Sequence, residues 1–193
     1  MLAPFMAALV AASLIELIIN VVAAHWLAPL AFFRLRLSRR VILPMRGDGY
    51  RARSLARPDY RAVARRFEVG DAVVFRSADG LTYVARRAFA LGSRRNLWVV
   101  RIDLLETEDG ILMTTRLVPT PLVYFVMQPL VIALGTTVGV FEARWDLGLP
   151  LVVLGGVGGA ILLFQNLFDG HRDTTVALVL ERLEAELAAT LPK

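Results

Sequence analysis

The sequence predicts an α+β membrane protein with three transmembrane helices, a cytoplasmic antiparallel β-meander and a C-terminal amphipathic helix. Its 193 residues are 56% hydrophobic, with a mean hydropathy of +0.58, which is too apolar for a soluble domain of this size. No Asp, Glu, Lys, Arg or His occurs between Leu117 and Phe141 or between Leu147 and Phe168. As a helix, each run spans the roughly 30 Å of a bilayer core. The link 142–146 joins the two runs, so residues 119–168 are expected to form a transmembrane hairpin.

The first transmembrane helix is expected in residues 1–33, where Glu16 and His25 are the only ionisable side chains between Leu2 and Phe33. A cleaved signal peptide is the alternative interpretation. It fits less well because no basic region precedes the apolar run, the run is long, and a carboxylate lies in its middle. We therefore expect a retained helix.

The distribution of arginine predicts the orientation. Of the 22 basic residues, 18 are arginines between Arg34 and Arg116, where nine acidic residues leave a net charge of +9. Basic residues concentrate on the cytoplasmic side of membrane proteins. We therefore expect a bacterial inner-membrane protein with the N-terminus and the 142–146 link outside, and the 34–118 module and the C-terminus in the cytoplasm.

The second half of the 34–118 module has the two-residue period of β-strands. Apolar residues alternate along three segments, and residues 72–75 supply a fourth candidate strand. The alternating positions are Leu81, Tyr83, Ala85 and Phe89, then Trp98, Val100, Ile102 and Leu104, then Ile111, Met113 and Leu117. Asp79-Gly80, Leu91-Gly92-Ser93 and Asp109-Gly110 are the expected turns. The last strand should lead directly into the second transmembrane helix.

Residues 58–67 have a helical pattern, with Pro58 at the expected start. A short basic helix beside a membrane is typical of an interfacial element that binds anionic lipid, and the alternative is a solvated face of a small domain. The basic residues expected to face lipid are Arg34, Arg36, Arg39, Arg40, Arg61, Arg65 and Arg66. Nucleic acid is not an expected partner, because aromatic residues are sparse here and the positive-inside bias accounts for the charge.

The C-terminal region, 169–193, has an apolar stripe at spacings of three and four residues, which predicts an amphipathic helix to about Ala189 with Asp173 or Thr174 as its N-cap. The stripe should pack on the β-meander, and a partner subunit is the alternative cover. Its members are Val176, Val179, Leu180, Leu183, Leu187 and Leu191.

Glu16 is the residue most indicative of a site, because an ionisable group inside a membrane span is costly. The simplest interpretation is a protonated carboxyl hydrogen-bonded to another intramembrane polar side chain; proton or ion handling and contact with a partner or cofactor are the alternatives. The candidate polar partners are Asn20, Gln128, Gln165 and Asn166.

His25 lies beside Trp26, a pairing typical of an interfacial anchor, and its alternative role is an axial ligand to a haem or chlorin. We otherwise expect no cofactor and no metal site, since the chain contains no cysteine and only two histidines.

Pairs of glycines four residues apart predict close helix packing, within the hairpin or against a neighbouring subunit. They are Gly135 with Gly139 and Gly155 with Gly159, and Gly135 and Gly155 should lie at similar depth.

With no set of catalytic residues in the sequence, we expect a non-catalytic accessory or scaffold subunit of a larger membrane complex, such as a respiratory or photosynthetic one. One alternative is a small oligomeric channel or transporter component that uses Glu16 and Asn20. Another is a membrane-tethered module that senses lipid or an acidic partner.

Overall fold

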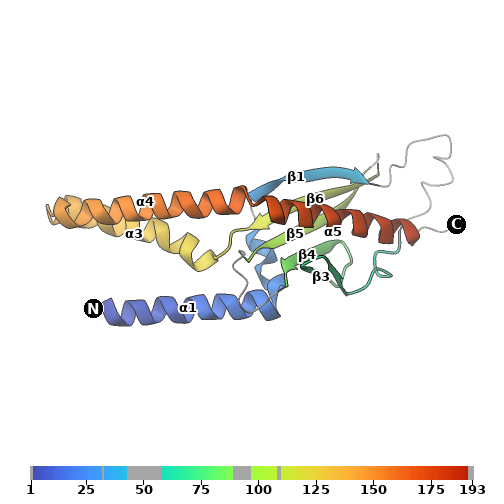
Figure 1. The fold of residues 1–193 in the computed structure, drawn as a ribbon, viewed down its shortest axis with the longest axis horizontal. Helices are drawn as coiled ribbons and strands as arrows, with labels where there is room; N and C mark the ends of the chain where they lie inside the picture. The colour runs from blue at the N-terminus through green and yellow to red at the C-terminus, as the bar shows by residue number, and fades with distance from the viewer. Residues whose placement is uncertain (1, 32, 43–57, 89–96, 108–109, 191–193) are drawn as a thin grey trace. The chain divides into compact units, whose positions relative to one another are not determined.

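The computed structural model describes residues 2–31, 33–42, 58–88, 97–107 and 110–190, with side chains for all of these except 2–7, 9, 25 and 35–42 (Figure 1). The chain is α+β and divides into two compact units, Met1–Ile18 with Pro119–Asp169 and Ile19–Val118 with Gly170–Lys193. The elements in chain order are α1 (Leu2–Val22), the 3-10 helix η1 (Ala24–Leu30), β1 (Phe33–Ile42), β2 (Arg66–Val69), β3 (Ala72–Arg76), β4 (Thr82–Arg87), β5 (Val99–Thr107), β6 (Gly110–Val118), α3 (Leu122–Phe141), α4 (Trp145–Leu167) and α5 (Gly170–Ala189).

The second unit is built on one antiparallel six-stranded sheet in the order β1-β6-β5-β4-β3-β2. β3 to β6 confirm the four predicted strands, and residues 119–121 alone separate β6 from α3. The predicted Asp79-Gly80 turn joins β3 to β4, and Gly80 takes the positive φ of +76° that glycine accepts without strain. Phe89, the 91–93 turn and Asp109 lie outside the described residues, and Gly110 opens β6 opposite Thr107.

The edge strand β1 is absent from the sequence-based prediction. It pairs with β6, with Arg34 opposite Arg116. Residues 33–37 do alternate apolar and basic side chains, which is a strand signal. Arginines beside an apolar segment also match the basic flank of a transmembrane helix, so the strand is missing from the prediction.

The prediction of a helix over residues 58–67 is wrong. Residues 60–62 form a turn, in which the Asp59 carboxylate accepts a hydrogen bond from the Arg61 backbone N–H at 2.9 Å. Phe67 lies in β2, which pairs with β3. Pairing with a strand that follows in the sequence therefore overrides the local helical period.

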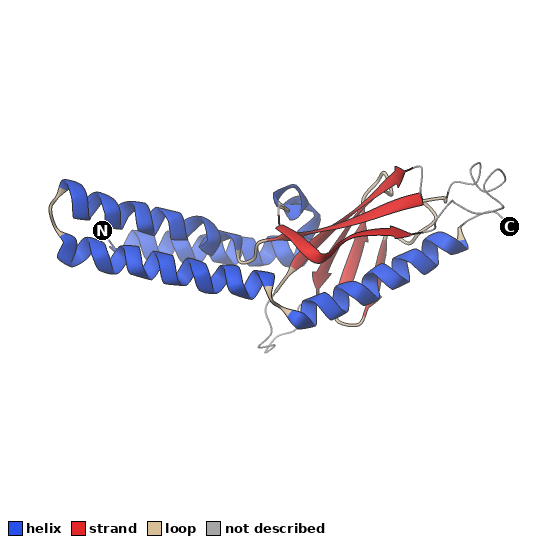
Figure 2. Ribbon diagram, turned by 90° about the horizontal axis from the view of Figure 1, so that it is seen from above, coloured by secondary structure: helices blue, strands red, loops and turns tan. Residues whose placement is uncertain are grey.

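One face of the sheet, here called the helix face, carries α5 (Figure 2). The alternating residues of β3 to β6 and the stripe of α5 form one buried cluster, which confirms the predicted packing of the stripe on the meander. The stripe members that the structure describes in this cluster are Val176, Val179, Leu180, Leu183 and Leu187. α5 begins at Gly170, so Asp173 lies in its first turn, Thr174 follows it inside the helix, and neither is the N-cap.

The opposite face, here called the arginine face, is covered in part by η1. A buried cluster joins this face to η1. The sheet contributes Val84, Val99 and Val118, η1 contributes Ala24, Leu27 and Ala28, and Ala31 follows η1. The continuous helix expected over residues 1–33 therefore ends at Val22. The apolar run that the sequence presents as one segment forms two elements, the helix α1 and then η1, which covers part of the sheet.

The first unit contains most of α1 together with the α3/α4 hairpin. Leu122–Phe141 and the helical stretch that starts at Trp145 are long and apolar enough to cross a membrane by length and composition. Within the described residues of α1, the apolar stretch Val10–Val22 is shorter and does not reach that length. Their large apolar side chains are turned outward: among them, Leu134 is 56% exposed and Leu154 66%.

Candidate functional site

Glu16 holds the beginning of α3. Both oxygens of its carboxylate accept hydrogen bonds from backbone N–H groups, Oε1 from Leu122 and Oε2 from Val123, the second at 2.8 Å. The Glu16 side chain is only 6% exposed. This arrangement ties α1 to the first turn of α3 within the first unit.

The local sequence explains why α3 uses a carboxylate from another helix. The first backbone N–H groups of a helix have no partner inside the helix, and a polar side chain at the N-cap normally accepts from one of them. The residue at the N-cap of α3 is Pro121, which has no side-chain acceptor. Glu16 takes over this role, and its negative charge lies at the positive end of the helix dipole.

Asn166, near the end of α4, binds the segment just before α3. Its Oδ1 accepts from the Thr120 backbone N–H at 3.0 Å, and its Nδ2 donates to the Thr120 carbonyl oxygen at 2.9 Å. The same Nδ2 donates to the Leu162 carbonyl at 2.9 Å. Thr120 and Asn166 are both buried. The Asn166 side-chain amide thus pairs with the Thr120 backbone N–H and C=O, which have left the hydrogen-bonding pattern of the sheet after the end of β6.

Together, Glu16, Thr120 and Asn166 form a polar cluster around the start of α3, which we call the α3 anchor. The prediction that Glu16 bonds to another polar side chain is wrong, since its partners are backbone amides. Asn20 is buried, and its Oδ1 has no hydrogen-bond partner in the described part of the chain. Gln165 is exposed, and Gln128 lies farther along α3.

The glycines pack inside the hairpin. A Cβ added to Gly135 would lie 2.7 Å from the Gly148 carbonyl oxygen, and one added to Gly139 would lie 2.6 Å from the Trp145 ring. The prediction that Gly135 and Gly155 lie at similar depth is wrong. Gly155 packs on Gln128 and Ile132 of α3 and does not meet Gly135. A Cβ on Gly159 would make ordinary contact with Gln128, so that glycine is not required for the close approach.

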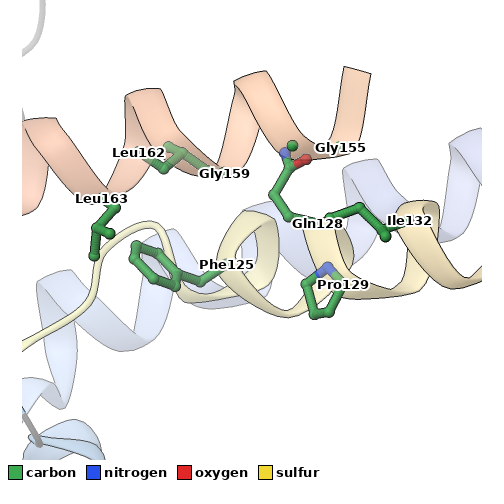
Figure 3. Close-up of a pocket in the computed structure, with 9 residues that line it drawn as sticks. Phe125, Gln128, Pro129, Ile132, Gly155, Gly159, Leu162 and Leu163 are labelled. Carbon is green, nitrogen blue, oxygen red and sulfur yellow. The ribbon is translucent and has the colours of Figure 1, made fainter. Parts of the chain in front are cut away.

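An apolar groove of about 270 Å³ runs along the hairpin between α3 and α4 (Figure 3). Gln128 is its one amide side chain and extends from α3 toward α4 at the level of Gly158. The residues that line it are Phe125, Gln128, Pro129, Ile132, Gly155, Gly156, Gly159, Leu162 and Leu163.

Sequence reasoning missed a second polar cluster, centred on Asp71 in the second unit. Its Oδ2 lies 3.1 Å from Nε of Arg87 and 3.0 Å from Nε2 of His171, and its Oδ1 accepts from the Thr175 hydroxyl at 3.1 Å. Partial burial opposes ionisation of Asp71, but hydrogen bonds from His171 and Thr175 and the nearby positive charges outweigh it and lower its pKa. The cluster fixes the first turn of α5 to the β2–β3 turn.

The remaining candidate residues are spread over several elements. Arg61, Arg65 and Arg66 are exposed, on the turn before β2 and on β2 itself. Arg34 is exposed on β1; the backbones of Arg36, Arg39 and Arg40 also lie in β1, and their side chains are outside the described ones. The backbone of His25 lies in η1, and its side chain is likewise outside the description, so the haem or chlorin interpretation stays a prediction.

The chain is α+β, with a six-stranded sheet, one helix packed on it, and a unit of long apolar helices joined by internal hydrogen bonds. Within the described residues, no three His, Asp or Glu side chains are placed to hold a metal ion together. No family model, no curated protein and no solved structure matches the chain.

Proposed function

We propose that this chain is a non-catalytic accessory or scaffold subunit of a larger membrane assembly, anchored by its apolar helices, with the β-rich module and C-terminus on the cytoplasmic side. The observation that carries the proposal is the α3 anchor. Glu16, the carboxylate inside the first apolar segment, is engaged through both oxygens in fixing α3. A carboxylate engaged in this way has a structural role. The outward sides of the helices then present apolar surface to lipid or to other subunits.

Two further features support a membrane location. The helices α3 and α4 are apolar on their outward sides, and large exposed apolar patches mark protein or membrane contacts. Their mutual contact is made by glycines, the residues that let helix backbones approach in membranes.

The channel or transporter alternative has less support. It requires Glu16 to exchange protons or ions with water, whereas the carboxylate is buried and both oxygens accept backbone hydrogen bonds. The lipid-sensing alternative draws on the arginines of the sheet, Arg34, Arg101 and Arg116.

The test is purification of the untagged protein from its native membrane in mild detergent, followed by mass spectrometry and an absorption spectrum of the same fraction. We expect partner subunits at fixed stoichiometry. A lone homo-oligomer would contradict the proposal, and a chromophore band would turn attention to His25.

A further inference from the structure

A row of arginines crosses the arginine face of the sheet. The strand register places Arg34 opposite Arg116 and Arg116 opposite Arg101, on three adjacent strands. Residues directly opposite in antiparallel strands have Cβ atoms about 5 Å apart, and like charges in such positions destabilise a sheet. The same row continues through Val84 and Phe75 to Arg66.

The charge of this row is only partly compensated within the described residues. Nε of Arg101 lies 2.7 Å from Oδ1 of Asp103. Nε of Arg116 is buried and has no hydrogen-bond partner in the part of the chain that is described. The same holds for Nε of Arg86, which lies on the same face of β4, two residues from Val84. Burial, and next the charge of Arg66, lower the pKa of Arg86. The Nε atoms of Arg116 and Arg86 are buried, so it is the accumulated positive charge of the neighbouring guanidinium groups that a phosphate oxyanion fits.

A second feature of this face favours a membrane lipid as the source of that phosphate. η1 lies against the same face, beside the arginine row, and its Trp26 is 68% exposed while its Leu30 is 43% exposed. Exposed tryptophan next to basic residues is typical of the headgroup region of a bilayer.

Chain length is consistent with this location. Leu122, the first residue of α3, is six positions after Arg116 in the sequence. An extended chain of that length reaches at most about 20 Å. If α3 starts at the membrane surface, as the proposed function requires, Arg116 lies within that distance of the headgroups.

We propose that the arginine row Arg34–Arg116–Arg101, together with η1, binds the phosphates of anionic phospholipid headgroups. The lipid phosphates supply the negative charge that Asp103 alone does not provide for the three opposed guanidinium groups, and Trp26 and Leu30 contact the adjoining part of the bilayer. This inference rests on the proposed membrane location.

The test uses the full chain in nanodiscs containing phosphatidylglycerol and phosphatidylcholine in equal amounts, and native mass spectrometry of the lipids retained after detergent release. Arg116→Gln removes the central charge of the row. Arg182→Gln is the matched control, because Arg182 is exposed on α5 and pairs with Glu186 at 2.8 Å. We expect the wild type and Arg182→Gln to retain phosphatidylglycerol in preference to phosphatidylcholine. In Arg116→Gln, the ratio of retained phosphatidylglycerol to phosphatidylcholine should be at least five-fold lower.

Equal retention of phosphatidylglycerol by wild type and Arg116→Gln would overturn the inference. A second overturning result is that soluble inorganic phosphate protects the protein in phosphatidylcholine against heat as well as phosphatidylglycerol does, because the ligand would then be a free phosphate.

The fold of Arg116→Gln is checked by its melting temperature in phosphatidylcholine alone, which should equal or exceed that of wild type because a like-charge contact is gone. If this variant does not fold, Arg34→Gln at the exposed edge replaces it, with the same expected loss. Extraction of the wild type by alkaline carbonate would separately refute the membrane location.

Discussion

Glu16 binds the backbone amide of Val123, 107 residues further along the chain, at 2.8 Å. The contact joins the middle of α1 to the first turn of α3 and accounts for the position of a carboxylate in an otherwise apolar segment. It makes the start of α3 depend on a side chain that local sequence does not provide.

We expect Glu16→Gln to destabilise the helical unit by about 1–3 kcal/mol, because the amide NH₂ replaces one acceptor and turns a donor toward a backbone N–H. Thermal unfolding in detergent would measure the change. Gln165→Ala is the control, since Gln165 is exposed on α4, and it should shift stability by less than about 0.5 kcal/mol. Equal effects of the two substitutions would show that Glu16 does not hold α3.

Asn166→Asp tests the other half of the α3 anchor. The substitution keeps an acceptor for the Thr120 N–H but removes the Nδ2 donor that bonds the Thr120 and Leu162 carbonyl oxygens. We expect a loss of about 1–3 kcal/mol, as for other buried groups left without partners. Limited proteolysis at the β6–α3 connection should accelerate in parallel. An unchanged cleavage rate would argue against a role of Asn166 in fixing this segment.

The glycines of the hairpin should differ sharply in their tolerance of alanine. A Cβ on Gly148 would lie 2.5 Å from the Gly135 carbonyl oxygen, whereas one on Gly156 meets nothing within 4 Å. We expect Gly148→Ala to cost about 1–3 kcal/mol through overpacking, and Gly156→Ala to be neutral or stabilising by up to about 1 kcal/mol in the isolated chain. Melting temperatures of the two variants provide the comparison, and similar values would refute the described helix contact.

Asp71 should make the module sensitive to acid. Because its folded-state pKa is lowered, it contributes stability that is present above the pKa of about 4 that aspartate has in an unfolded chain, and this contribution is lost as pH falls through the folded-state pKa. The stability advantage of wild type over Asp71→Asn should therefore be full at pH 6 and shrink below about pH 4. Thermal unfolding across this range measures it, with Glu181→Gln on the exposed side of α5 as a control. A difference that does not depend on pH would contradict the assignment.

Tyr83 is fully buried on the helix face, and burial raises its pKa to about 12. Its hydroxyl has no hydrogen-bond partner among the described residues. We expect Tyr83→Phe to be neutral or stabilising by about 1 kcal/mol, since an unsatisfied buried hydroxyl is removed. The tyrosinate absorbance of wild type and variant should coincide up to about pH 11. An earlier divergence would show that the Tyr83 hydroxyl reaches water.

Much of the module was predictable because its signals are local. Alternation along Tyr83–Ala85 and Val100–Leu104 identified both the strands and the buried face, and the stripe of α5 has the matching helical period. β2 was not predictable in this way, because a four-residue strand carries too little pattern and depends on β3 for its pairing.

The sequence predicts one part of the α3 anchor, the buried carboxylate of Glu16, but not its partners. The cost of a buried carboxylate identified Glu16, but its partners are backbone amides, which have no signature in sequence. One signal was available: Pro121 stands where α3 needs a capping side chain, so an acceptor had to come from elsewhere. The Asp71 cluster had no such signal, because Asp71 and His171 are 100 residues apart and meet only in the folded module.

We propose that the hairpin crosses a membrane with the module and α5 on the cytoplasmic side, and labelling of single cysteines is the sharpest test of this topology. The chain has no native cysteine, so Glu142→Cys in the hairpin link and Ala185→Cys on the exposed side of α5 each give one reporter. With a membrane-impermeant maleimide on intact cells, we expect Glu142→Cys to be labelled and Ala185→Cys to be labelled only after lysis. Labelling of Ala185→Cys in intact cells, or protection of Glu142→Cys there, would rule out this topology.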